Sequence, residues 1–102
     1  MSNSPHSRDD APVYGRIGNL AVVQLPGRAF PAIAVQGDTF QALVAQAEGL
    51  ASAILASGVE AEMAEEVVHA LSRLRAARDF YEGVLCDRGI GLPYTRPRES
   101  EG

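Results

Sequence analysis

The sequence contains no lysine, no tryptophan and one cysteine. Its nine basic residues are all arginines and stand against thirteen acidic residues, giving a formal net charge of −4 and a pI near 5.0. Proteins that bind nucleic acid need a surplus of cationic side chains, so this balance argues against a nucleic-acid partner. A cationic protein is the more natural partner, because an acidic surface attracts basic ones.

The scarcity of cysteine and of long apolar runs bears on the compartment. Cys86 cannot form an intramolecular disulfide alone, and a free thiol suits a reducing cytoplasm. The N-terminal stretch MSNSPHSRDDAP lacks the apolar segment of a signal peptide. No apolar run approaches the roughly 20 residues that cross a bilayer. We therefore expect a cytoplasmic protein with no membrane association.

The length and composition suit one globular domain. A chain of 102 residues with 46% hydrophobic content can bury a modest core. Residues 1–12 and 95–102 are polar, so we expect a disordered N-terminal arm and a disordered C-terminal tail. Residues 13–94 then form a single domain.

Two short apolar segments predict an antiparallel β-hairpin, Asn19–Leu25 and Pro31–Gln36. Pro26-Gly27 between them suits the central positions of a type II turn, since proline presets φ and glycine accepts a positive φ. A hairpin alone is marginally stable. We expect Val13–Ile17 as a third strand, a helical layer or a second subunit to complete the sheet.

Two helices are predicted after the strands. Asp38 suits a helix N-cap and Gln41 completes a capping box. Gly49, in the middle of the first helix, suggests a close crossing by another element, because glycine costs about 1 kcal/mol there relative to alanine. The first apolar stripe contains Phe40, Leu43, Ala47, Leu50 and Ile54.

The second helix is expected from about Glu60 to Asp87. Its acidic start and later arginines complement the helix dipole, and Gly89 suits a left-handed terminator with Ile90 folding back on Leu85. Its apolar stripe contains Met63, Val67, Ala70, Leu74, Ala77, Tyr81 and Val84. A short Ser-Gly link makes the helices an antiparallel pair. The predicted fold class is α+β, order ββαα, with a small antiparallel sheet packed on an antiparallel two-helix hairpin.

The sequence offers little for catalysis or metal binding. His69 and Cys86 lie 17 positions apart on one predicted helix, about 25 Å along its axis, too far for a dyad. Glu66 and His69 have the spacing of carboxylate di-iron helices, but the first helix adds only Glu48 as a further carboxylate. We expect no enzyme activity, no bound metal and no cofactor.

Two stretches resemble a known family: NLAVVQLPGRAFPAIAVQGDTF (Asn19–Phe40) and FYEGVLCDRGIGLPY (Phe80–Tyr94). Together they are similar to small bacterial proteins that carry a domain of unknown function, over residues 19–94. This resemblance implies no activity, cofactor or catalytic residue. In size and acidity the chain is similar, by analogy, to immunity proteins that neutralise bacterial toxins.

These observations predict a small acidic cytosolic binding protein of the immunity or antitoxin type, which occludes a cationic bacterial toxin. The alternative is a self-assembling structural or regulatory homo-oligomeric module with no toxin partner. A homodimer is expected, because the sheet has an exposed edge and the helical stripes are broad. The candidate partner-binding residues are Glu60, Glu62, Glu65, Glu66, Arg28, Phe30, Gln36 and Asp38.

Overall fold

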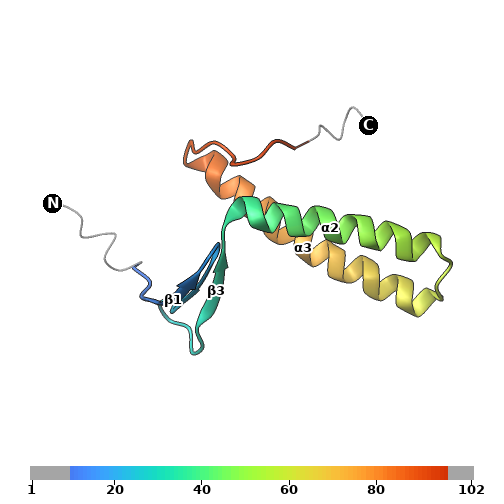
Figure 1. The fold of residues 1–102 in the computed structure, drawn as a ribbon, viewed down its shortest axis with the longest axis horizontal. Coiled ribbons are helices and arrows are strands. Elements are labelled where there is room, and N and C mark those ends of the chain that lie inside the picture. Colours follow the sequence, from blue (N-terminus) through green and yellow to red (C-terminus); the bar gives the residue numbers. More distant parts are fainter. Residues whose placement is uncertain (1–9, 97–102) are drawn as a thin grey trace. The chain divides into compact units, whose positions relative to one another are not determined.

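The computed structural model describes residues 10–96. Three strands precede two helices, in the order β1 (Val13–Ile17), β2 (Leu20–Val23), β3 (Ala32–Val35), α2 (Gly37–Ala56) and α3 (Ala61–Asp87) (Figure 1). The α+β class and the order of elements are confirmed, with Val13–Ile17 as the third strand. The chain divides into two compact units, Met1–Gln36 and Gly37–Gly102. The packing of the sheet on the helices stays a prediction.

The first unit is an antiparallel sheet in the order β1-β2-β3. Between β2 and β3, the Arg28 amide donates a hydrogen bond to the Leu25 carbonyl at 3.2 Å, and Gly27 has a φ of 78°. Pro26 and Gly27 therefore occupy the central turn positions, as predicted. The Gln24 side chain donates to the Arg28 carbonyl at 2.7 Å and fixes the start of the β2–β3 loop.

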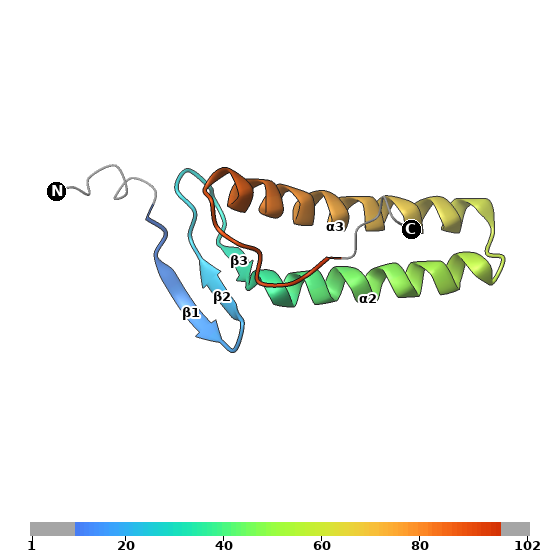
Figure 2. The same cartoon turned by 90° about the horizontal axis from the view of Figure 1, so that it is seen from above.

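The second unit is an antiparallel helical pair, with α2 and α3 side by side (Figure 2). The end of α3 is the predicted Schellman motif. Gly89 has a φ of 70° and donates to the Cys86 carbonyl at 3.1 Å, and the Ile90 amide donates to the Leu85 carbonyl at 2.9 Å.

The predicted capping box at the start of α2 is wrong. The helix already includes Gly37, so Asp38 lies in its first turn, where its Oδ1 accepts a hydrogen bond from the Thr39 amide at 2.8 Å. Gln41 does not reach back, because its side-chain oxygen is buried without a hydrogen-bond partner. Asp38 still places a negative charge near the positive end of the helix dipole.

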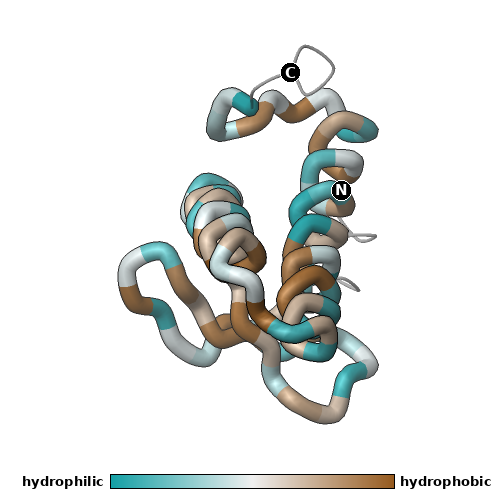
Figure 3. The backbone as a smooth tube through the Cα atoms, turned by 90° about the vertical axis from the view of Figure 1, so that its right-hand side faces the viewer, coloured by the Kyte–Doolittle hydropathy of each residue, from teal (hydrophilic) through white to brown (hydrophobic). Residues whose placement is uncertain are grey.

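The predicted phase of α2 is also wrong by about one residue. Leu43, Leu50 and Ile54 are 50%, 63% and 39% exposed, whereas Val44 and Ala51 are buried. Smaller side chains thus form the seam with α3 and larger ones flank it. Apolar and polar residues alternate along both helices (Figure 3), and on α2 the large side chains of Leu43 and Leu50 are exposed.

The close helix approach occurs at Gly37, and the prediction for Gly49 is wrong. A Cβ atom added at Gly37 would overlap the ring of Tyr81 on α3, whereas a Cβ at Gly49 meets nothing within 4 Å. The start of α2 therefore requires a residue without a side chain. Tyr81 fills the space that the side chain would occupy.

We predict opposite effects for alanine at these two glycines. Gly37→Ala should lower the free energy of unfolding by about 1–2 kcal/mol, since overpacking outweighs the gain in helix propensity. Gly49→Ala, the matched control, should raise it by up to about 1 kcal/mol. Thermal and urea unfolding measure both. Equal effects at the two positions would contradict the close contact between Gly37 and Tyr81.

Candidate functional site

The start of α3 carries four glutamates on the protein surface. Glu60, Glu62, Glu65 and Glu66 are all exposed, and none forms an ion pair with another residue of the 10–96 range. Glu60 is the N-cap but makes no side-chain capping hydrogen bond; its carbonyl accepts from the Ala64 amide at 2.9 Å. Four uncompensated carboxylates within two turns give this end of α3 a concentrated negative charge.

The two candidate residues of the β2–β3 loop lie beside an open hollow. Arg28 and Phe30 line it together with Leu25, Pro31 and Ala32, and its volume is about 540 Å³. Phe30 is 81% exposed. An aromatic ring and a guanidinium group at a loop tip are the residue types that anchor protein interfaces.

The remaining two candidates lie elsewhere in their units. Gln36 is at the far end of β3 from Phe30, and its amide donates to the Asn19 carbonyl at 3.0 Å. Asp38 lies in the first turn of α2, so the antiparallel pairing places it at the opposite end of the helical unit from Glu62. The predicted residues therefore form several separate groups.

One face of the sheet is apolar and exposed. The paired positions Ile17 and Leu20, and Val22 and Ile33, point to the same side of the sheet, because partners across an antiparallel pair share a face. These four side chains are 77%, 43%, 41% and 73% exposed, respectively. They line a shallow depression of about 280 Å³, and we name them the apolar sheet face.

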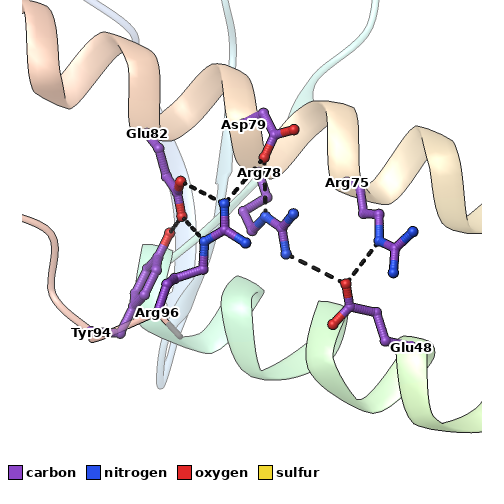
Figure 4. A network of polar contacts seen from close by, with 7 residues as sticks. All are labelled: Glu48, Arg75, Arg78, Asp79, Glu82, Tyr94 and Arg96. Carbon is purple, nitrogen blue, oxygen red and sulfur yellow. Dashed lines mark hydrogen bonds and ion pairs between the residues drawn. The ribbon is translucent and has the colours of Figure 1, made fainter. Parts of the chain in front are cut away.

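A polar network links the two helices at the centre of the helical unit (Figure 4). Arg78 of α3 is buried, with a side chain only 5% exposed. Its Nη1 lies 3.7 Å from Glu48 Oε2 on α2, and its Nε donates to Asp79 Oδ1 at 3.2 Å. Arg75 Nε donates to the same Glu48 oxygen at 2.8 Å. Glu48 thus anchors α2 to two arginines of α3.

The segment after α3 is tied back onto that helix. Arg96 pairs with Glu82 through two hydrogen bonds, from Nε at 3.0 Å and from Nη2 at 3.1 Å. The Tyr94 hydroxyl donates to Glu82 Oε2 at 2.8 Å. Partial burial, followed by this hydrogen bond, raises the pKa of Tyr94 to about 12. Tyr94 and Arg96 together form a C-terminal strap on Glu82.

Residues 10–96 contain no group of three or more histidine, cysteine, aspartate or glutamate side chains that could hold a metal ion. Glu66 and His69 are both exposed neighbours on α3, and Cys86 is a free, exposed thiol. No helix in this range is long and apolar enough to cross a bilayer.

The polar network was not predicted, although the sequence carries a signal for it. Val67, Leu71, Leu74, Arg78, Tyr81 and Leu85 follow one another at alternating steps of four and three residues. That spacing places Arg78 in the helix seam. The predicted apolar stripe through Ala70 and Ala77 has the same period but does not include Arg78. Glu48, four residues after Val44 and three before Ala51, carries the corresponding signal on α2.

The fold and these surfaces define a small α+β protein with a three-stranded antiparallel sheet and a helical hairpin, and with exposed apolar and acidic surfaces. The chain belongs to a family of unknown function (DUF6959), whose model matches residues 6–94. The expected resemblance to an uncharacterised family is confirmed. No curated protein and no solved structure matches the chain.

We predict that Glu48→Gln lowers the free energy of unfolding by about 1–2 kcal/mol, because the buried Arg78 loses its interhelical carboxylate. Asp79→Asn is the matched control. Asp79 is 60% exposed, so this variant should cost less than about 0.5 kcal/mol. Urea unfolding of both variants gives the comparison. A smaller effect for Glu48→Gln than for Asp79→Asn would show that Glu48 does not anchor the helical pair.

The strap should respond to high pH. The folded-state pKa of Tyr94 lies above the ordinary value of 10.0. The contribution of the neutral Tyr94 side chain to the free energy of unfolding is therefore complete below pH 10 and is lost as the pH rises towards 12. An absorbance titration should show one tyrosine ionising near pH 12. Tyr94→Phe should remove that component, and the control Tyr14→Phe should leave it in place. Persistence of the component in Tyr94→Phe would assign it to another residue.

Proposed function

We propose that this protein is a non-catalytic protein-binding module. The exposure of large apolar side chains on both units carries the proposal: the apolar sheet face, Phe30 at the loop tip, and Leu43 and Leu50 on α2. Monomeric soluble proteins rarely expose contiguous apolar patches of this kind unless the patch binds another molecule. Within the described residues, each of the two units has exposed apolar side chains that another protein can contact.

The partner that we favour is a cationic protein, as a bacterial toxin would be, which this protein neutralises by occluding its surface. The four exposed glutamates at the start of α3 support this choice, since an uncompensated acidic patch steers a basic partner towards it. The site of action that we propose is the cytoplasm. The free, exposed thiol of Cys86 is compatible with a reducing compartment.

The second candidate is a self-assembling structural or regulatory module without a toxin partner. The observation that favours it is the exposed apolar side of the helical pair, where Leu50 is 63% exposed. A second copy that covers this side would remove its apolar side chains from water.

The toxin hypothesis predicts that Glu65→Arg slows association with the cationic partner several-fold at low salt, and that the difference vanishes as salt rises. The partner to use is the protein encoded directly upstream of this gene. Association rates over a salt series measure the effect, and growth rescue of cells that express the partner measures protection.

The control is Asp87→Arg, an equal change of charge at the other end of α3. It should affect association less than Glu65→Arg does. Equal rates for wild type and Glu65→Arg at low salt would remove the acidic helix start from the interface.

A further inference from the structure

One side of the helical pair carries an apolar furrow between α2 and α3. We define it by Ala47, Leu50 and Ile54 of α2 and Val67, Ala70 and Leu74 of α3, which line a depression of about 200 Å³. Its lining includes no polar or charged side chain. A partner that fills the furrow must therefore be apolar as well, because a polar group buried there would find no hydrogen-bond partner.

The shape of the furrow allows the same surface of a second copy to pack against it. On the α2 side Leu50 and Ile54 stand out, at 63% and 39% exposed, whereas on the α3 side the exposed position is the small Ala70. A two-fold axis perpendicular to the helices brings the α3 helices of two copies together at the small Ala70, which allows a close approach, and sets the aliphatic side of α2 against that of the second copy. Such an isologous contact uses the same surface on both chains.

The charges beside the furrow specify the partner and its direction. Glu66 precedes Ala70 by four residues and Arg73 follows it by three, so both border the furrow on α3. Both are exposed, and neither pairs with another residue in the part of the chain that the structure describes. When two α3 helices cross antiparallel at Ala70, each Glu66 lies beside the partner's Arg73, and the two pairs form symmetrically.

We infer that the furrow is the interface of a homodimer, in which a second copy of this chain completes a four-helix bundle with its α3 antiparallel to the first. This inference names one partner of the binding module proposed above and rests on that function.

The first test is the mass of the full chain in solution, by sedimentation and light scattering across micromolar concentrations. The expected mass is twice 10.8 kDa. Leu50→Glu should give a monomer with an unchanged helical circular-dichroism spectrum, because Leu50 is mostly exposed within its own copy. Val68→Glu is the matched control: Val68 is 50% exposed but lines a different hollow, with Leu55, Ser72 and Arg75. It should remain dimeric.

The second test fixes the register and does not depend on the furrow variant folding. Glu66→Arg and Arg73→Glu should each raise the dissociation constant of the dimer about tenfold, because each change replaces two attractive pairs with two repulsive ones. The double variant Glu66→Arg/Arg73→Glu should restore the wild-type constant. A simple loss of charge at a structural position would not be rescued in this way.

Three results would overturn the inference. They are a mass of 10.8 kDa at every concentration, loss of the dimer in Val68→Glu but not in Leu50→Glu, and failure of the double charge swap to restore association. A monomer that still binds the cationic partner would leave the binding-module proposal intact. A dimer that binds no other protein would leave the dimer inference standing and remove the toxin.

Discussion

A buried cation holds the helical unit together. Arg78 occupies a seam position where an apolar residue is usual, and burial of a guanidinium group costs several kcal/mol unless anions compensate it. Glu48 supplies that compensation from the facing helix, and Asp79 adds a second carboxylate from the next position on α3. Because one partner sits on each helix, this pair fixes which face of α2 meets α3.

The exposed apolar surfaces follow from that constraint. With Arg78 in the seam, Val44 and Ala51 are the buried apolar residues of the described range, and Leu43, Leu50 and Ile54 are displaced to the side. A helical pair with so small a core gains little stability from its own packing. Any chain that covers its apolar side would add binding free energy to folding free energy, so the proposed association would raise the stability of this protein.

The sequence was informative where local chemistry decides the structure. Proline and glycine at residues 26 and 27, glycine at residue 89 and the β-branched strands each act within a few residues, and all of them were predicted. The phase of α2 was not, because two neighbouring stripes have the same period, and hydrophobicity alone favours the one with the larger side chains. Contacts between the two helices select between them, such as that of Glu48 with Arg78, which lie 30 positions apart. The sequence predicted which residues are exposed candidates for binding. Which of them lie together on one surface depends on the phase of the helix, which was predicted wrongly.

The proposed self-association and the proposed binding of a cationic partner would use different sides of α3. Glu66 borders the furrow, whereas Glu65 lies nine residues before Leu74, which is two and a half helical turns, and therefore points away from it. A dimer built on the furrow would still present Glu65 to solvent in both copies. Dimerisation would then place two acidic patches on one particle and strengthen its attraction for a basic surface, because the potentials of like patches add. The proposed dimer and the proposed binding of a cationic partner would therefore be compatible in one assembly.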